Sequence, residues 1–173
     1  MTLAHINLGS VRGICVGLLL LGNLTAAPQL FAEPPQTPDA SRRLYDRIME
    51  EFHHKDYVAA LAGFRFFLEL HEQSSLSANA QYWLGECQYR MGRYKDALGS
   101  FYDLISYYPM SQKAAASTLK IGQIYTKQGD REKAQAMYER VTDQYPNTAE
   151  AEVARKALET AAAKHEPVAG EPS

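Results

Sequence analysis

This sequence lacks an excess of positive charge and every short motif typical of a catalytic site. Its 18 Lys and Arg residues are balanced by 20 Asp and Glu residues, for a formal net charge of −2, so no basic surface indicates nucleic-acid binding. No nucleophile elbow, phosphate-binding loop or HExxH run occurs, and the histidines lack the spacing of metal ligands. We therefore predict no enzymatic activity, no cofactor and no metal site in this 173-residue chain.

Acidic residues are also absent from residues 1–32, where Arg12 is the only Lys or Arg. The apolar stretch from Gly13 to Gly22 is too short to cross a bilayer, which needs about 20 apolar residues. A short apolar segment after a basic residue is typical of a secretory signal peptide. We expect residues 1–32 to be a signal peptide cleaved after Ala32. Cleavage after Ala27 and an uncleaved anchor through residues 13–32 are the alternatives.

Cysteine is scarce, with Cys15 and Cys87 the only two. Cys15 follows Arg12-Gly13-Ile14 and so lacks the small residue and apolar run expected before a lipidated cysteine. Removal of residues 1–32 leaves Cys87 alone, which excludes an intramolecular disulfide. The domain must therefore be stabilised by packing, with Cys87 as a small buried apolar side chain.

The strongest positive signal is an internal repeat with a stride of 37 residues. Five positions of one segment recur in the next, and the pairs are Gly85 and Gly122, Gly92 and Gly129, Ala97 and Ala134, Phe101 and Tyr138, and Pro109 and Pro146. A weaker copy lies another 37 residues upstream. It keeps Tyr57, Ala60 and Phe64 but has Ile48 and Lys55 in place of the two glycines. We infer three repeats.

The first glycine of each repeat, Gly85 or Gly122, lies inside a helical pattern, where glycine costs about 1 kcal/mol relative to alanine. Such a glycine is tolerated where a neighbouring helix must come close. Ala97 and Ala134 give the second helix a small face that can press against the first, and Phe101 and Tyr138, four residues later on the same stripe, fill the space beside that small face. We therefore predict tight packing of the two helices within a repeat.

The second glycine, Gly92 or Gly129, suits the left-handed conformation that ends a helix. The proline of each repeat stops the second helix. Ser111 and Thr148 follow these prolines and can cap the next helix.

These signals predict seven helices within a domain of residues 41–163. A flexible linker of residues 33–40 precedes the domain, and a disordered tail of residues 164–173 follows it. The expected helices are Ser41–His54, Tyr57–His71, Ser75–Met91, Tyr94–Tyr107, Ser111–Gln128, Arg131–Gln144 and Thr148–Ala163. The last of them has the composition of a terminal helix that covers the third repeat.

The repeat resembles the tetratricopeptide repeat (TPR), whose pattern is Trp-x2-Leu-Gly-x2-Tyr, then Ala-x3-Phe, then Pro. The third copy matches it with Thr118, Ile121, Gly122, Tyr125, Ala134, Tyr138 and Pro146. The second copy matches with Gln81, Leu84, Gly85, Gln88, Ala97, Phe101 and Pro109. This resemblance implies an all-α fold, a right-handed α-solenoid of about three TPR helix pairs plus a C-terminal capping helix.

The stride is three residues longer than the usual ~34. With this stride, residues 80–86 and the Tyr-Pro turns at residues 107–111 and 145–148 resemble the C-terminal TPR domain of Tol-Pal-associated periplasmic proteins of the YbgF/CpoB type. The resemblance implies a periplasmic scaffold that links outer-membrane constriction to cell-wall synthesis at division, with a Tol-complex component or a cell-wall synthase as partner. That family usually has a trimerising N-terminal coiled coil, for which residues 33–40 leave no room, so the resemblance does not extend to a trimer.

Two other interpretations remain open. The BamD-type lipoprotein of outer-membrane assembly has similar Tyr-Pro-ended repeats, but it requires a lipidated cysteine. A cell-wall enzyme would require convergent polar residues that the sequence does not display.

TPR arrays bind partners along the first helices of the repeats, and the resemblance carries this role to three sets of residues. Tyr82, Glu86, Tyr89 and Arg90 combine aromatic and charged side chains on one helix face, which suits recognition of a peptide. The alternative is that these tyrosines only pack against the next repeat. The expected binding residues are Tyr45, Met49, Phe52 and His53 in repeat one, Asn79, Tyr82, Glu86, Tyr89 and Arg90 in repeat two, and Leu119, Gln123, Thr126 and Lys127 in repeat three.

Overall fold

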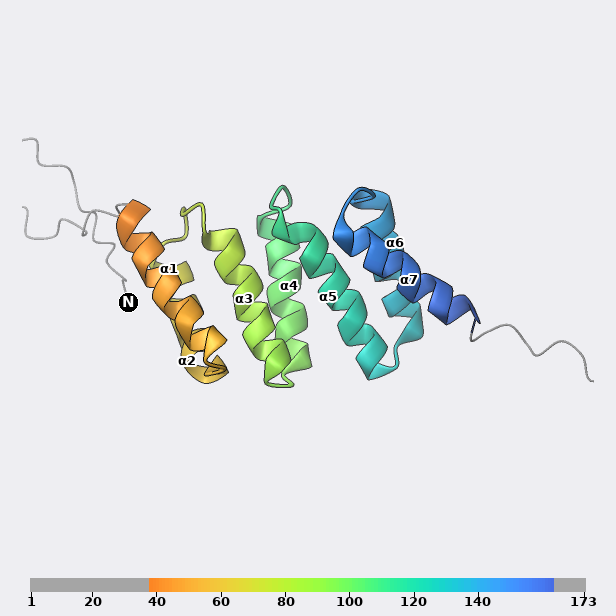
Figure 1. The fold of residues 1–173 in the computed structure, drawn as a ribbon, viewed down its shortest axis with the longest axis horizontal. Coiled ribbons are helices and arrows are strands. Elements are labelled where there is room, and N and C mark those ends of the chain that lie inside the picture. Colours follow the sequence, from red (N-terminus) through yellow and green to blue (C-terminus); the bar gives the residue numbers. More distant parts are fainter. Residues whose placement is uncertain (1–37, 164–173) are drawn as a thin grey trace, which may run out of the picture. The chain divides into compact units, whose positions relative to one another are not determined.

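The computed structural model describes residues 38–163, and these form seven α-helices and no β-strand (Figure 1). The predicted signal peptide, most of the predicted linker and the predicted tail lie outside this range. The first helix begins at Pro38, three residues before the predicted start at Ser41, because proline suits the first turn of a helix. Within the described range, no helix is both long and apolar enough to span a bilayer. The helices are α1 (Pro38–His53), α2 (Tyr57–Leu70), α3 (Ser77–Arg90), α4 (Tyr94–Tyr107), α5 (Lys113–Gln128), α6 (Arg131–Gln144) and α7 (Ala149–Ala163).

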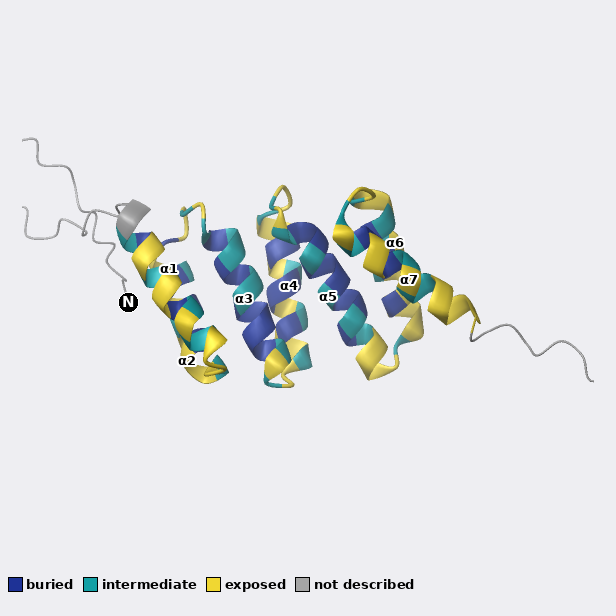
Figure 2. Cartoon of the chain, viewed as in Figure 1, coloured by how far each residue is buried: buried dark blue, intermediate teal, exposed yellow. Residues whose placement is uncertain are grey.

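Each helix packs against the next one along the chain, and in addition α3 contacts α5 and α5 contacts α7. Three helix pairs therefore stack in sequence order, and α7 covers the last pair. This is the predicted all-α solenoid of three pairs with a capping helix. Figure 2 shows that the buried residues concentrate on the central helices α3 to α5, whereas α1 and α7, the first and last helices of the described range, are largely exposed.

The tight packing predicted at the first glycine of each repeat is confirmed. A Cβ on Gly85 would lie 2.7 Å from Cε1 of Phe101, and a Cβ on Gly122 would lie 2.7 Å from Cε1 of Tyr138. Repeat one has Ile48 at this position, and there the glycine is on the other helix. A Cβ on Gly63 of α2 would lie 2.8 Å from Cγ1 of Ile48. The two helices thus approach each other closely in all three pairs, because one of the two has a glycine where they cross.

The turns within the repeats share one backbone conformation. Gly92 and Gly129 have φ of 74° and 79°, as predicted, and Lys55 takes the same conformation with φ of 65°. The amide of the following residue donates to the carbonyl five residues earlier in each case. These bonds run from Asp56 to Glu51, from Arg93 to Gln88 and from Asp130 to Tyr125, each 2.8–3.0 Å long. The same hydrogen bonds therefore hold Lys55 in a conformation that suits glycine.

The starts of α3 and α5 differ from the prediction by two residues each, because a turn precedes each helix. Ser74 Oγ accepts a hydrogen bond from the amide of Leu76 at 3.2 Å, and Ser111 Oγ accepts one from Lys113 at 3.1 Å. The two hydroxyls thus stabilise the turn rather than capping a helix that begins at once. Thr148 is the cap expected for α7, since its Oγ1 accepts from the amide of Ala151 at 3.2 Å.

Candidate protein-binding surface

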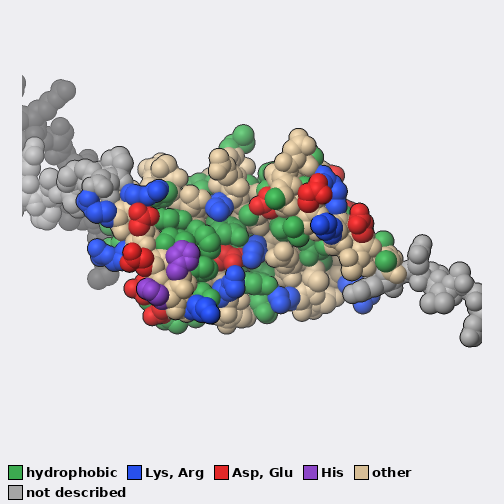
Figure 3. All heavy atoms as spheres, viewed as in Figure 1, with side chains coloured by type: hydrophobic (Ala, Val, Ile, Leu, Met, Phe, Trp, Pro, Cys, Tyr) green, Lys and Arg blue, Asp and Glu red, His purple; other side chains and the backbone are tan. Residues whose placement is uncertain are grey.

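The first helices of the three repeats, α1, α3 and α5, lie on one side of the stack, which faces the viewer in Figures 1 and 3. We call this side the α1/α3/α5 face. Figure 3 shows that hydrophobic side chains gather between α1 and α3, and that Lys and Arg side chains lie over α3 and α5, while charged side chains of both signs lie over α1. The face thus has an apolar area between α1 and α3 and a basic area toward the middle of the stack.

The apolar part is an aromatic cluster that joins α1 to α3. The rings of Phe52 and Trp83 have centroids 4.7 Å apart, and Phe52 also contacts Tyr57 at 5.4 Å. Trp83 in turn contacts Tyr82 edge-on at 5.4 Å. Phe52, Tyr82 and Trp83 are only half-buried, so these large rings stay open to solvent on one side. Aromatic groups of this kind supply much of the binding free energy in protein interfaces.

Tyr45 and Met49 lie deeper in the same region. Tyr45 contacts Phe64 and Phe67 of α2 edge-on at 5.9 and 5.8 Å, and Met49 packs on the same core. Burial raises the pKa of Tyr45. Tyr45 therefore packs mainly within repeat one, beside the aromatic cluster.

A buried ion pair links α3 to α5 at the centre of the face. The side chain of Glu86 is 4% exposed, and its Oε1 lies 2.7 Å from Nζ of Lys120, although the approach does not have hydrogen-bond geometry. Arg90 Nε lies 3.8 Å from Oε2 of the same carboxylate. A buried carboxylate requires such compensation, because its desolvation is costly. Glu86 is therefore enclosed by the two cations and does not present its oxygens to a partner.

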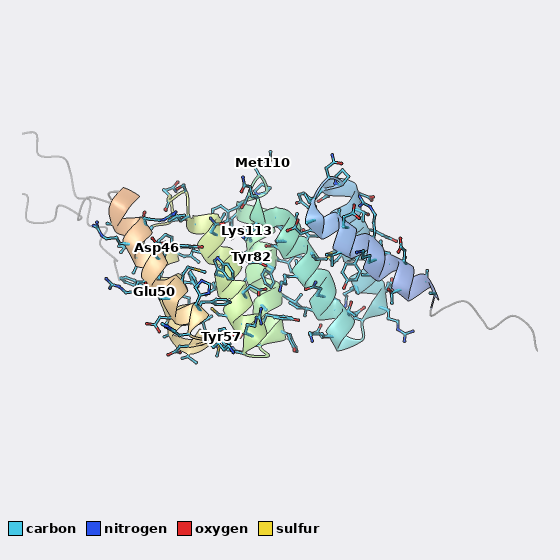
Figure 4. All side chains as sticks on the ribbon, viewed as in Figure 1. Asp46, Glu50, Tyr57, Tyr82, Met110 and Lys113 are labelled. Atoms are coloured by element: carbon cyan, nitrogen blue, oxygen red, sulfur yellow. The ribbon has the colours of Figure 1, made fainter. Side chains whose placement is uncertain are left out.

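Three lysines of α5 lie seven residues apart, and each is placed over an aromatic ring of α3. Lys113 Nζ is 4.8 Å from the ring centroid of Tyr82 and 5.7 Å from that of Trp83. Lys120 and Lys127 lie 4.9 and 6.0 Å from the ring centroid of Tyr89. Figure 4 shows Lys113 and Tyr82 side by side, on α5 and α3 respectively, with Asp46 and Glu50 on the neighbouring α1. We call Lys113, Lys120 and Lys127 the lysine row.

Several of the expected binding residues have other surroundings. Asn79 lines an open pocket beside the turn between α4 and α5, together with Tyr107 and Met110. The Thr126 hydroxyl lies 2.9 Å from that of Tyr138 and 3.0 Å from the carbonyl of Gly122, so its hydrogen bonds are made at the contact between α5 and α6. Leu119 is buried in the core shared by α5, α6 and α7. These three positions do not join the aromatic cluster or the lysine row.

Gln123 is half-buried and His53 is exposed, with a ring contact to Phe52 at 6.1 Å between centroids. Tyr82, Glu86, Tyr89, Arg90 and Lys127, by contrast, do come together on the α3 and α5 part of the face. The structure therefore places five of the expected residues in one charged and aromatic group.

This surface also includes three residues that the sequence did not lead us to expect there: Trp83, Lys113 and Lys120. The seven-residue spacing of Lys113, Lys120 and Lys127 was a usable signal, because residues seven apart lie on the same side of a helix. Tyr82 and Tyr89 have the same spacing on the preceding helix. Which of these lysines lies over which tyrosine depends on how α3 and α5 align.

The described residues offer little for catalysis. No group of three or more His, Cys, Asp or Glu side chains in residues 38–163 could hold a metal ion. Cys87 is fully buried, and burial raises the pKa of its thiol to about 12, so its thiolate is not populated near neutral pH.

These features define a class of protein: a helical solenoid whose first helices lie on a common face. Residues 76–147 match the family model described as "Tetratricopeptide repeat". The match covers repeats two and three. A search of curated proteins finds no match.

Solved structures with a similar fold include a chain of the "CopN-Scc3 complex", with a TM-score of 0.61 at 14% identity over 72% of this chain and 71% of that one. Another is a chain of the "Crystal structure of PcrH in complex with the chaperone binding region of PopB", with a TM-score of 0.60 at 17% identity. That alignment covers 70% of this chain and 97% of the other. At these identities the similarity establishes the fold alone, an all-helical TPR-like solenoid.

Proposed function

We propose that this protein is a periplasmic TPR adaptor that binds other envelope proteins through the α1/α3/α5 face. The observation that carries the proposal is the half-buried aromatic cluster of Phe52, Tyr82 and Trp83 beside the lysine row. Half-buried rings leave apolar surface in contact with water, and a bound partner that covers this surface gains the free energy of its burial. The similar solved structures are complexes with protein partners by their titles, which supports a protein as the ligand.

The cellular role proposed here comes from the sequence. The apolar segment of residues 13–22 supports export, and the Tyr-Pro-ended repeats support a role linked to the Tol-Pal system in envelope maintenance and cell division. Expected partners are a Tol-complex component or a cell-wall synthase. Mass measurement of the mature protein isolated from the periplasm tests the export step, with Glu33 as the expected N-terminal residue. A diacylated cysteine would instead support a BamD-like subunit.

Site-specific crosslinking in cells tests the binding surface. A photoreactive amino acid at Tyr82 should crosslink to envelope proteins, while the same group at Lys95 on the exposed surface of α4 should crosslink much less. Recovery of equal and unrelated sets of proteins from both positions would contradict the proposal. Hydrolysis of purified peptidoglycan by this protein would favour the cell-wall enzyme instead.

A further inference from the structure

We propose that the α3 and α5 part of the face binds an acidic peptide segment in extended form, with its carboxylates on the lysine row and an apolar side chain on the Phe52–Tyr82–Trp83 cluster. The inference rests on the proposed adaptor function and specifies the chemistry of the partner. It follows from the spacing of the lysines, the balance of charge around them and the position of the aromatic rings.

The lysine row presents cations at regular intervals. Residues seven apart on α5 are separated by about 10.5 Å along the helix axis. The Lys120 side chain is 19% exposed, and Lys127 is exposed at the end of α5. Each ammonium has three N–H donors, and the ring beneath it accepts no conventional hydrogen bond, so donors remain for an incoming carboxylate. The rings instead limit the positions that the ammonium groups adopt.

The charge around the row is positive on balance. Lys113, Lys120, Lys127 and Arg90 are four cations, while Glu86 supplies one buried carboxylate between Lys120 and Arg90. Glu150 of α7 also acts electrostatically on Tyr82 and reduces the positive potential at that end. The local excess contrasts with the net charge of −2 of the whole chain. Electrostatic complementarity therefore favours a partner segment rich in Asp or Glu.

The aromatic cluster lies at the Lys113 end of the row. Trp83 contacts both Phe52 and the Lys113 ammonium, so an apolar anchor bound there is adjacent to the first carboxylate. On α1, beyond the cluster, Asp46 and Glu50 are exposed (Figure 4), and Arg42 lies 3.4 Å from Asp46, so the charge on that side is mixed. The excess of cations lies along α5, which sets the direction of the segment: anchor toward α1, carboxylates along α5.

The spacing also indicates the conformation of the peptide. An extended chain advances about 3.3 Å per residue, so about three residues cover the distance between successive lysines. Carboxylates at every third position would then meet Lys113, Lys120 and Lys127 in turn. A helical segment would need acidic residues seven apart to do the same.

Fluorescence anisotropy with the full chain tests this proposal. The probe is a labelled, end-capped peptide of about twelve residues with Glu at every third position after one Phe, a length that spans the row with a margin. The reference peptide has Gln in place of each Glu. We expect the acidic peptide to bind at least about tenfold more tightly, and its affinity to fall as salt rises from about 50 to about 300 mM. Equal affinity for the two peptides, or binding of neither, would overturn the proposal.

Charge reversal locates the site. Lys113→Glu and Lys127→Glu should each weaken binding of the acidic peptide, and together they should weaken it by about tenfold or more. Lys95→Glu on α4 makes the same change of charge away from the face, and it should change Kd less than about twofold. Lys120 is left intact because it compensates Glu86. Melting temperatures of all variants confirm folding, and equal effects of the α5 and α4 substitutions would overturn the proposal.

Two further measurements separate the possible failures. Competition by a single-stranded oligonucleotide as effectively as by the acidic peptide would show a general polyanion site and overturn peptide recognition. If crosslinking from Tyr82 captures envelope proteins but Lys113→Glu and Lys127→Glu leave that capture unchanged, the adaptor function stands and the acidic-segment proposal fails. If crosslinking from position 82 captures no protein, the adaptor function fails, and the acidic-segment proposal that rests on it fails with it.

Discussion

The ring of Phe101 occupies the space that a side chain on Gly85 would need, with Cε1 only 2.7 Å from the position of a Cβ. Phe101 has no exposed surface and lies in the central core, where it contacts the ring of Tyr82 at 5.7 Å between centroids. This contact connects the packing of α3 on α4 to the exposed aromatic cluster. The Phe101 ring that requires glycine at position 85 therefore also packs against the ring of Tyr82.

Gly85→Ala should lower the free energy of unfolding by about 1–2 kcal/mol. The new methyl group overlaps the Phe101 ring, and overpacking in a core costs about 1–3 kcal/mol, partly offset by the better helix propensity of alanine. Gly85→Leu should cost more. Thermal and urea denaturation measure the change.

Gly99 provides the matched control. It also lies inside a helix, α4, but nothing is within 4 Å of the position of its Cβ. Gly99→Ala should therefore stabilise the protein by about 0.5–1 kcal/mol. A Gly85→Ala protein as stable as the parent, or a Gly99→Ala protein that is equally destabilised, would refute the packing role of Gly85.

Lys55→Gly should stabilise the protein by about 1 kcal/mol. Lys55 has φ of 65°, a left-handed conformation that costs a residue with a Cβ about 1–2 kcal/mol, whereas glycine adopts it freely. Gly92→Ala is the reciprocal change in the next repeat and should destabilise by a similar amount. Urea midpoints at constant m-value check both, and a decrease on Lys55→Gly would show that the lysine side chain outweighs the backbone strain.

Lys120→Met should destabilise the protein by about 2 kcal/mol, because it leaves the buried carboxylate of Glu86 with only Arg90 at 3.8 Å. The double variant Glu86→Leu/Lys120→Met removes both charges and should recover most of that loss. A double-mutant cycle in chemical denaturation gives the coupling free energy, expected at about 1–3 kcal/mol. Additive effects of the two substitutions would mean that the pair is not coupled.

Cys87 should be inert to thiol reagents in the native protein and should make stability fall at high pH. Burial, with a smaller effect of Glu86, raises the pKa of the thiol to about 12, against about 8.5 in an unfolded chain. Between these values the unfolded state has lost a proton that the folded state keeps. The free energy of unfolding therefore decreases as pH rises, by up to about 1.4 kcal/mol per pH unit from this group.

The test uses a Cys15→Ser chain, in which Cys87 is the only thiol. Reaction with a thiol reagent at pH 8 should occur only in denaturant, and urea denaturation between about pH 8.5 and 11 should show the decline. Cys87→Ala should remove this part of the pH dependence, while the titration of buried tyrosines remains. Rapid labelling of the native protein would contradict the burial of the thiol.

Much of this fold could be predicted because the repeat is local. The 37-residue register placed Gly85 and Gly122 in helices and Gly92 and Gly129 at helix ends, and each position has the backbone or contact expected of it. The starts of α3 and α5 were wrong by two residues, since Ser74 and Ser111 can cap a helix or hold a turn, and the sequence does not distinguish the two.

The candidate surface was predicted less completely. Tyr82 and Tyr89 were identified on one helix face, but Lys113 and Lys120 were not, because their position over those rings depends on the alignment of two helices from different repeats. Thr126 is exposed as expected, but its hydroxyl also lies 2.9 Å from that of Tyr138 on the next helix, a contact that was not predicted.

The sequence by itself determined the period, the left-handed glycines that follow α3 and α5, and the places where two backbones come close. These features depend on interactions within a helix or a turn, and a glycine or a capping residue in the sequence indicates them directly. The tertiary structure decided which side chains of α3 and α5 meet, that Glu86 is enclosed rather than exposed, and that Lys113 lies over Tyr82. Those contacts join residues about 30 positions apart, and only the stacking of one repeat on the next brings them within reach.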